Sequence, residues 1–412
     1  MLELTELSRI GFGGYRIDNE TKSHGESLAY ALKAGCNLVE TASNYRAGES
    51  EKLIGKVCKA NQNLDVFIIT KTGYIHNSEL KAVLEFHEAK CPLDKPTEVR
   101  SDFYYSLSPE YLERQIKKSC QNLQRQVIDG FLLHNPEYLY QGNKSKDEVY
   151  YTIKRAFTFL EEKVKTRQIR YYGVSSNTMC TLQHKFSIDF TKLLEIANEV
   201  STNNHFKLVE FPFNLLEQEA LEHYKFESSL VEIIKSKEMI SLANRPFSAN
   251  GLNGPVRLVT YDDVSNLNPD SDSIHYLNLK NDISKELIKK NYEGDVDDFQ
   301  VIQYLNENWM GINSHEQKNQ IINRFLIPLL NEIFGEKSPH TLESFLYVFE
   351  MYTKKNITIQ ANKLISSKSL YKYDKNKILT QGLCEHYLDS GIDCVLVGMR
   401  NKKYVDELSY LF

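Results

Sequence analysis

The stretch Asn37-Leu38-Val39-Glu40-Thr41-Ala42-Ser43-Asn44-Tyr45 is a short apolar run that ends in a carboxylate, followed by a tyrosine. Two later runs also end in a polar residue, namely Phe67-Ile68-Ile69-Thr70-Lys71 and Phe131-Leu132-Leu133-His134. Apolar runs of this length are typical of strands buried in a parallel sheet. In a parallel barrel the carboxyl ends of all strands meet on one face. The three runs therefore predict one site that gathers a carboxylate, a tyrosine, a lysine and a histidine.

Outward from this stretch, short apolar runs alternate with longer stretches of helical period. The candidate strands span residues 10–15, 37–42, 66–71, 128–134, 169–175, 207–213, 240–247 and 394–399. The candidate helices between them include residues 27–34, 49–58, 109–123, 147–165 and 190–199. Eight strands alternating with helices predict an α/β protein of the (β/α)8 TIM barrel class. An open doubly wound sheet is the rival, and the lack of a dinucleotide-binding fingerprint favours the closed barrel.

Two segments are too long for ordinary barrel connections. The first spans residues 73–107 and is rich in aromatic residues, and the second follows the seventh strand. We expect a barrel from residues 1–255 and 378–412, with an inserted segment at 256–377 that is partly loop and partly helical. The loop part contains the turn-like stretch Asn268-Pro269-Asp270-Ser271-Asp272, and helical period follows it.

Composition excludes several classes of protein. The chain has 412 residues, of which 41% are hydrophobic, and its net charge is −5. These values argue against global disorder and give no signal for nucleic acid, and no apolar run is long enough to span a membrane. Seven cysteines without a Cys-x-x-Cys pair are typical of reduced thiols. Together with the lack of a signal-peptide pattern, they predict a cytoplasmic protein without a metal site.

The four polar residues at the strand ends have complementary chemistry. Hydride reduction of a carbonyl needs an acid, and Tyr45 is protonated at neutral pH but is a weak donor. An ammonium such as Lys71 lowers a phenol pKa by favouring the phenolate, and Glu40 can hold that ammonium in place. His134 can polarise and orient the carbonyl oxygen. The hydride itself has to come from a nicotinamide.

Other motifs fail on inspection. The run Gly11-Phe12-Gly13-Gly14-Tyr15-Arg16 has arginine where a dinucleotide fingerprint needs its third glycine. The run from Gly48 to Val57 has its glycines too far apart for a phosphate loop and lacks the metal-binding serine or threonine. Neither motif therefore supports a Rossmann or P-loop nucleotide site.

The motifs together resemble those of the aldo-keto reductase family over residues 5–255 and 380–410. The resemblance is carried by Gly11 to Tyr15, Glu40 to Tyr45, Gly48 to Gly55, Gly173 to Asn177, Val209 to Leu216, Asn244 to Phe247 and Val397 to Val405. It implies a (β/α)8 oxidoreductase that interconverts an aldehyde, ketone or sugar carbonyl and the alcohol. Tyr45, Lys71, Glu40 and His134 would be the catalytic residues, with Tyr45 as the general acid or base.

The resemblance also implies a cofactor, and the basic residues after the last strand favour NADP(H) because they would neutralise a 2′-phosphate. The implied cofactor-binding residues are Gly14, Tyr15, Glu40, Ser175, Ser176, Asn177, Glu210, Asn244, Arg245, Pro246, Gly398, Arg400, Lys402 and Lys403. Substrate contacts are expected from residues 73–107, from residues 135–143 with Tyr138 and Tyr140, or from the insertion.

Three departures from the family pattern leave alternatives open. Glu40 replaces the usual aspartate, Glu210 replaces the usual glutamine, and Asn244 stands where many members stack an aromatic on the nicotinamide. A second hypothesis is therefore a cofactor-sensing or scaffold protein on the same barrel, with the insertion as the surface for a protein partner. A third is a cofactor-free isomerase or lyase that uses Lys71 and Glu40.

Overall fold

The computed structural model describes most of the chain. The described residues are 2–75, 77–90, 95–225, 228–251, 254–264, 266–335, 337–367, 374 and 377–412. Their contacts divide the chain into two compact units. The first unit is Met1–Pro246 with Leu383–Phe412, and the second is Phe247–Gly382.

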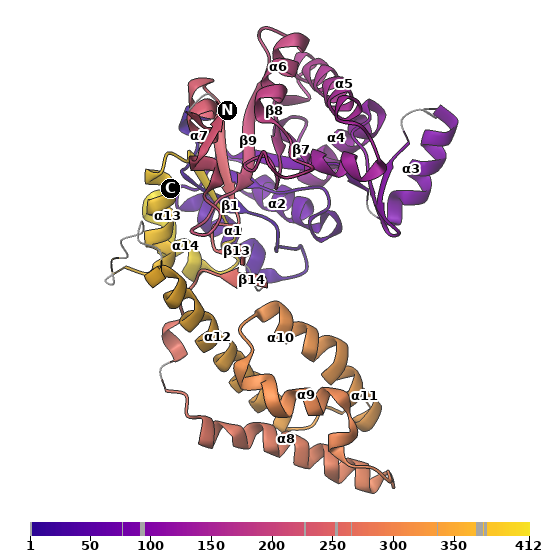
Figure 1. Cartoon of the computed structure of the whole chain (residues 1–412), viewed down its shortest axis with the longest axis vertical. Helices are drawn as coiled ribbons and strands as arrows, with labels where there is room; N and C mark the ends of the chain where they lie inside the picture. The colour runs from indigo at the N-terminus through magenta and orange to yellow at the C-terminus, as the bar shows by residue number, and fades with distance from the viewer. Residues whose placement is uncertain are drawn as a thin grey trace. The chain divides into compact units, whose positions relative to one another are not determined.

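The first unit is built around a closed barrel of parallel strands (Figure 1). In order around the barrel, the strands are β1 (Ile10–Gly13), β15 (Cys394–Val397), β12 (Ile240–Asn244), β9 (Phe206–Pro212), β8 (Ile169–Ser175), β7 (Ile128–His134), β3 (Phe67–Thr72) and β2 (Leu38–Glu40). Each predicted strand overlaps one of them, and the closure of the sheet excludes the open alternative. The predicted (β/α)8 class is confirmed.

Helices cover the outside of this barrel (Figure 1). They include α1 (Lys22–Lys33), α2 (Glu49–Ala60), α4 (Pro109–Leu123), α5 (Lys146–Lys165), α6 (Phe190–Val200), α7 (Leu230–Ser236), α13 (Leu379–Asp389) and α14 (Lys402–Leu408). Neighbouring helices contact one another in the series α14, α1, α2, α4, α5 and α6. Helix α4 begins as the sequence predicts, with Ser108 Oγ accepting from the Tyr111 N–H at 3.2 Å and Pro109 in the first turn.

The barrel interior is filled by an apolar layer of side chains, which is two residues deep on β3 and on β15. Its buried members are Leu38, Phe67, Ile69, Leu132, Leu208, Leu242, Cys394 and Leu396. Every side chain of β3 and of β7 is buried, because helices cover the outer face while this layer fills the inner one. The apolar layer forms the floor beneath the carboxyl ends of the strands.

The long segment after β3 has its own structure. It holds helix α3 (Asn77–Lys90) and a small antiparallel sheet of β4 (Tyr74–Ile75), β6 (Phe103–Tyr105) and β5 (Thr97–Arg100). Gly73 joins β3 to this sheet with a φ of 142°, and a Cβ at Gly73 would lie 2.3 Å from the Tyr105 ring. Only glycine permits so close an approach. The turn therefore places Tyr74 directly beyond the carboxyl end of β3.

The second unit is mainly helical. Its elements are β13 (Ser248–Gly251), β14 (Gly254–Arg257), α8 (Pro269–Lys289), α9 (Gln300–Asn308), α10 (His315–Ile321), α11 (Ile327–Phe334) and α12 (Thr341–Ser367). Its core surrounds Trp309, whose ring lies 5.3–6.1 Å from the rings of Tyr276, Phe345, Phe349 and Tyr352.

One expectation for this unit was wrong. The stretch from Asn268 was predicted as part of a turn-rich loop, but Asn268 caps α8 and accepts from the Asp270 N–H at 3.0 Å. Asparagine followed by proline suits both a turn and a helix start, because the missing N–H of Pro269 costs nothing in a first helical turn. The loop part of the insertion is correspondingly shorter.

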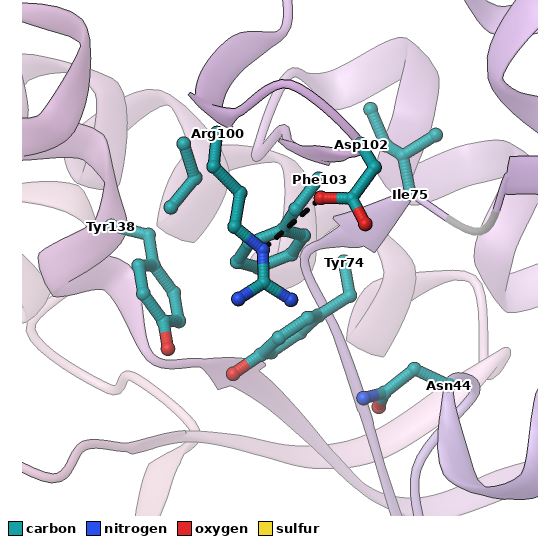
Figure 2. A pocket seen from close by; sticks show the side chains of 8 residues that line it. Asn44, Tyr74, Ile75, Arg100, Asp102, Phe103 and Tyr138 are labelled. Carbon is teal, nitrogen blue, oxygen red and sulfur yellow. Dashed lines mark hydrogen bonds and ion pairs between the residues drawn. The ribbon is translucent and has the colours of Figure 1, made fainter. Parts of the chain in front are cut away.

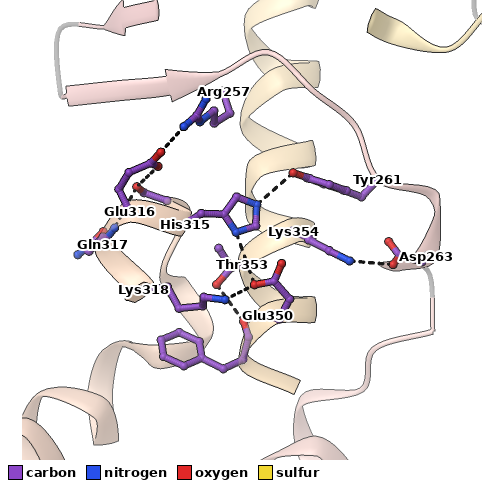
Figure 3. Close-up of polar contacts among 12 residues, drawn as sticks. Arg257, Tyr261, Asp263, His315, Glu316, Gln317, Lys318, Glu350, Thr353 and Lys354 are labelled. Atoms are coloured by element: carbon purple, nitrogen blue, oxygen red, sulfur yellow. Dashed lines mark hydrogen bonds and ion pairs between the residues drawn. The ribbon is translucent and has the colours of Figure 1, made fainter. Parts of the chain in front are cut away.

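A polar network joins the segment after β14 to the helices of this unit (Figure 3). Tyr261 Oη lies 3.0 Å from His315 Nε2, and His315 Nδ1 lies 3.5 Å from Glu350 on α12. Lys318 also pairs with Glu350. The His315 contact and then Lys318 lower the pKa of Glu350 to about 2. These bonds give the segment a fixed place in the unit.

Three further findings concern the described part of the chain. Its cysteines Cys36, Cys58, Cys120, Cys180, Cys384 and Cys394 are unpaired thiols, and Cys91 lies outside it. None of its helices combines the length and hydropathy needed to cross a membrane. Nor do three or more of its His, Cys, Asp or Glu side chains gather in a way that could hold a metal ion.

Candidate active site

Polar side chains form a layer at the carboxyl end of the barrel, next to the apolar floor. Five barrel strands carry a floor residue and, two positions later, a polar residue. Because side chains alternate along a strand, both members of each pair face the interior. The pairs are Leu38 with Glu40, Ile69 with Lys71, Leu132 with His134, Leu208 with Glu210 and Leu242 with Asn244. The polar members converge on one site.

Lys71 lies at the centre of this site and its side chain is fully buried. It pairs with Glu40, and its Nζ lies 3.1 Å from Glu210 Oε2. Burial lowers the pKa of Lys71, and the Glu210 carboxylate partly offsets that effect. The order of motifs had suggested Glu40 as the partner of Lys71; Glu210 adds a second carboxylate.

Glu210 links three neighbouring strands. Its Oε1 accepts from Ser175 Oγ on β8 at 3.0 Å and from Asn244 Nδ2 on β12 at 2.8 Å. The Asn244 side chain therefore turns toward Glu210, and its Oδ1 is buried without a hydrogen-bond partner among the described residues. The ends of β8, β9 and β12 thus present a fixed polar surface with one unused acceptor.

Tyr45 lies beside Lys71 in the turn after β2. The two residues that follow, Arg46 and Ala47, have φ angles of 49° and 57°, which non-glycine residues seldom adopt. Lys71 Nζ lies 5.1 Å from the centroid of the Tyr45 ring, but among the described contacts no hydrogen bond joins it to the hydroxyl. Burial and then Glu210 raise the pKa of Tyr45. The phenol is held protonated.

His134 completes the group at the end of β7. Its ring centroid lies 6.0 Å from that of Tyr45 and 4.7 Å from that of Tyr74. Its Nδ1 is buried without a hydrogen-bond partner in the described residues. Burial and the Lys71 charge lower the pKa of His134 well below its usual value. The imidazole is therefore neutral and keeps a polar atom for a ligand.

The turn after β1 packs closely against the carboxyl end of β2. The Gly14 N–H donates to the Glu40 carbonyl at 2.7 Å, and Ser50 Oγ donates to the Gly14 carbonyl at 2.8 Å. A Cβ at Gly14 would lie 2.6 Å from the Glu40 carbonyl oxygen, so this approach requires glycine. The next residue, Tyr15, is 64% exposed, and its ring centroid lies 5.0 Å from that of Tyr45.

The remaining residues expected at the nicotinamide end have other contacts. The Ser176 N–H donates to the Glu210 carbonyl at 3.0 Å, and Asn177 Nδ2 donates to Asn135 Oδ1 at 3.1 Å. Arg245 pairs with Glu217 at 2.7 Å, while the Pro246 carbonyl accepts from Tyr387 Oη at 3.1 Å. Ser175, Ser176 and Asn244 are therefore the expected cofactor residues that hydrogen-bond to Glu210.

The residues expected at the phosphate lie at the end of β15 and the start of α14. Gly398, Arg400, Lys402 and Lys403 are all exposed, and a Cβ at Gly398 would meet only open space. Lys402 Nζ lies 3.6 Å from Glu26. The three basic residues thus form an exposed positive group.

A pocket is lined in part by Tyr74, whose ring lies 4.7 Å from that of His134 (Figure 2). This mouth pocket has a volume of about 430 Å³ and is lined by Asn44, Tyr74, Ile75, Val99, Arg100, Asp102, Phe103 and Tyr138. The Tyr74 and Phe103 rings stack with centroids 5.0 Å apart, and Tyr138 lies 5.6 Å from Tyr74. Tyr140, expected beside Tyr138, instead stacks on Phe186. Three of the eight lining residues are aromatic, and Arg100 and Asp102 add a charged part to the wall.

Two residues near this pocket gave no sequence signal of their own. Tyr74 follows Lys71 by three positions across the Gly73 turn, so the glycine after a strand end was its only marker. Glu137 is buried in the turn after β7, where its carboxylate accepts from the Asn177 N–H at 2.8 Å. Burial raises the pKa of Glu137 to about 7.

The fold and the site together define the class of protein to which the chain belongs. A closed (β/α)8 barrel carries, at the carboxyl ends of its strands, a buried ammonium between two carboxylates beside a protonated tyrosine and a neutral histidine. Active sites of such barrels lie at this end. The arrangement is that of a (β/α)8 barrel protein with a buried polar site at the carboxyl ends of its strands.

Comparisons with known proteins assign the chain to one family within this class of protein. The model of the Aldo/keto reductase family matches residues 9–225, which is more than half of the chain. The chain belongs to the aldo/keto reductase family. Similar curated proteins include the uncharacterized oxidoreductase YqkF of Bacillus subtilis, 26% identical over 171 residues, or 42% of this chain and 45% of that protein.

Two further proteins are similar to this chain, one by sequence and one by structure. The NADH-specific methylglyoxal reductase of Escherichia coli is 28% identical over 136 residues, which are 31% of this chain and 38% of the reductase. The chain thus spans less than half the length of either relative. Among solved structures, the glycerol dehydrogenase AKR11B4 of Gluconobacter oxydans is 16% identical, with 90% of this chain and 94% of that chain covered and a TM-score of 0.41. The strand pairing of the barrel, rather than this superposition, establishes the fold.

Proposed function

We propose that this protein is an NADP(H)-dependent oxidoreductase that interconverts the carbonyl group of an aldehyde, ketone or sugar and the corresponding alcohol. The observation that carries the proposal is the buried group of Tyr45, Lys71 and His134 at the barrel mouth. Lys71 Nζ lies 5.1 Å from the Tyr45 ring centroid, and the His134 ring lies 6.0 Å from it. Membership of the aldo/keto reductase family supports the same chemistry.

The residues at the ends of β8, β9 and β12 fit a nicotinamide. Asn244 Oδ1 is a buried acceptor without a partner among the described residues, which costs about 1–3 kcal/mol. A carboxamide N–H donor would remove that cost. Ser175, Ser176, Asn177, Glu210 and Asn244 would hold this end of the cofactor, and Gly14 with Tyr15 would border it. When bound, the nicotinamide supplies or takes up the hydride.

Tyr45 would donate the proton in the reductive direction. Its raised pKa keeps the hydroxyl protonated at neutral pH, so the acid form is always present. Lys71 would stabilise the phenolate left after donation, and Glu40 would hold Lys71 in place. Acid–base catalysis of this kind typically contributes about 10²–10⁴-fold to the rate.

His134 would orient the substrate. Because it is neutral, it can direct a ring N–H toward a carbonyl oxygen without adding a second positive charge beside Lys71. The mouth pocket adjoins His134 through Tyr74, and the rings of Tyr74, Phe103 and Tyr138 would give a substrate an apolar surface beside the reacting carbonyl. The pocket suits aryl aldehydes, lipophilic ketones and sugars.

The choice of NADP(H) rests on the basic residues after β15. Arg400, Lys402 and Lys403 form an exposed positive group that would neutralise a 2′-phosphate. A relative with 28% identity is named for its NADH specificity, so the two nucleotides need a direct comparison.

The test is a fluorescence titration of the purified protein with NADPH and with NADH, followed by a nicotinamide absorbance assay over a panel of aldehydes, ketones and sugars. The proposal predicts tighter binding of NADPH and turnover of at least one carbonyl. If neither nucleotide binds, the proposal is wrong.

A second function is favoured by one specific observation. Lys71 contacts two carboxylates but, among the described contacts, makes no hydrogen bond to Tyr45. The longer Glu40 side chain could hold the ammonium too far from the phenol for efficient catalysis. The protein would then be a cofactor sensor or scaffold, with residues 256–377 binding a protein partner. This function predicts cofactor binding without turnover, and loss of the partner when residues 256–377 are deleted.

A further inference from the structure

The buried site holds more negative than positive charge. The side chains of Glu40, Lys71 and Glu210 are 5%, 0% and 1% exposed, and the ammonium contacts both carboxylates. Among the described residues, no second cation contacts either carboxylate. Tyr45 and His134 are neutral, because burial raises the pKa of the phenol and lowers that of the imidazole. Two carboxylates therefore share one ammonium, and the site carries one excess negative charge.

Glu210 is the carboxylate that carries this excess toward the ligand. Glu40 lies against Lys71, whereas Glu210 also accepts from Ser175 at 3.0 Å and from Asn244 at 2.8 Å. Ser175 and Asn244 are the residues proposed to hold the nicotinamide. The hydrogen bonds fix the position of Glu210 but bring no positive charge to it.

An unpaired charge in a buried site is costly, and a ligand of opposite charge relieves that cost. The nicotinamide ring is positively charged when oxidised and neutral when reduced. The two redox states would therefore differ in their interaction with Glu210, although they differ little in shape.

We infer that Glu210 makes this site prefer the oxidised, cationic nicotinamide to the reduced, neutral one. This inference rests on the proposed function, since it assumes that a nicotinamide binds beside Glu210. It assigns to Glu210 a role in cofactor redox preference, separate from proton transfer by Tyr45. Oxidised cofactor would be held more tightly than reduced cofactor, so the equilibrium between the bound species would shift toward NADP⁺ and the alcohol, and release of NADP⁺ would slow turnover in the reductive direction.

The experiment compares the dissociation constants of NADP⁺ and NADPH, measured by calorimetry at one salt concentration, for the wild type and Glu210→Gln. The amide keeps the size of the side chain and one acceptor oxygen. We expect NADP⁺ to bind more tightly than NADPH in the wild type. In Glu210→Gln the ratio of the two constants should shift toward NADPH by about tenfold or more.

Two further variants sharpen this test. Glu40→Gln also leaves one carboxylate for one ammonium, so it should shift the ratio of the two dissociation constants in the same direction. If Glu210→Gln does not fold, Glu40→Gln replaces it in the test. Glu161→Gln removes another buried carboxylate, which contacts His205 on the outside of the barrel, and should leave the ratio unchanged.

Two results would overturn the inference and are distinguishable. If both nucleotides bind but the ratio is the same in the wild type, Glu210→Gln and Glu40→Gln, the charge inference fails while the proposed function stands. If neither nucleotide binds the wild type, the proposed function fails and the inference fails with it.

Discussion

The ring of Tyr74 lies 4.7 Å from the ring of His134 and also lines the mouth pocket. Asn135 fixes this relationship, because its Nδ2 donates to Tyr74 Oη at 2.6 Å. Asn135 follows His134 in the chain and has a φ of 56°, in the left-handed region that asparagine tolerates. One turn thus positions both the histidine and the nearest wall of the pocket.

The first prediction concerns that wall. Tyr74→Ala should raise KM for an aryl aldehyde about tenfold, because the variant loses an aromatic surface that contacts His134 and Phe103. Affinity for NADPH should change little. Steady-state kinetics measure both quantities. Tyr151→Ala, which removes a 65% exposed tyrosine from α5, is the control, and an unchanged KM in Tyr74→Ala would contradict the assignment of the pocket.

The second prediction concerns the buried ion pairs. Lys71→Met should lower the free energy of unfolding by about 3–5 kcal/mol, because it leaves Glu40 and Glu210 buried without a cation. Adding Glu40→Gln and Glu210→Gln to that variant should recover much of the loss. Urea unfolding at pH 7 measures the effect.

The control for this prediction is Lys163→Met, since Lys163 pairs with the more exposed Glu113. That change should cost about 1 kcal/mol or less. Equal stabilities for Lys71→Met and Lys163→Met would show that the two carboxylates are not charged in the folded protein.

The third prediction concerns pH and Glu137. Burial raises the pKa of Glu137 from 4.5 to about 7, so between these values the folded state binds more protons than the unfolded state. This contribution to stability is fully present below pH 4.5 and is lost as the pH rises through 7. Glu137→Gln cannot ionise and should therefore gain stability over the wild type by about 1–3 kcal/mol at pH 8. Urea unfolding at pH 5 and pH 8 tests this, and an equal difference at both pH values would refute it.

The fourth prediction concerns the nucleotide phosphate. Arg400→Ala combined with Lys403→Ala should raise the dissociation constant of NADPH about tenfold or more and leave that of NADH nearly unchanged. Fluorescence titration measures both constants. Lys59→Ala, at the exposed end of α2, controls for a general change in charge. Equal effects on NADPH and NADH would remove these residues from the 2′-phosphate site.

Much of the barrel was predictable because its strands are short apolar runs, and several of them, such as β2, β7 and β12, end in a polar residue. The spacing of Leu38 and Glu40, or of Leu208 and Glu210, places both side chains on the inner face once the strand is recognised. That local rule also brings Lys71 and His134 into the same layer. Each family motif is a continuous stretch of sequence, so it could be recognised without knowing which distant segments are in contact.

The parts that the sequence did not predict depend on such contacts. Nothing in the chain order says that Glu210 reaches Lys71, or that Asn244 turns its amide toward Glu210. The pocket walls come from the turn after β2, from β4, β5 and β6, and from the turn after β7, which only the folded chain brings together. The start of α8 was misread because Asn268 and Pro269 suit a turn as well as a helix cap.

The most direct measurement of the central claim compares the wild type with Tyr45→Phe. It follows NADPH oxidation with a carbonyl that the wild type turns over, together with the dissociation constant of NADPH. Tyr15→Phe makes the same chemical change in the neighbouring exposed tyrosine and is the matched control. We predict that Tyr45→Phe loses about 10²-fold or more in turnover while NADPH affinity stays nearly the same and Tyr15→Phe remains active. Full turnover in Tyr45→Phe would contradict the mechanism.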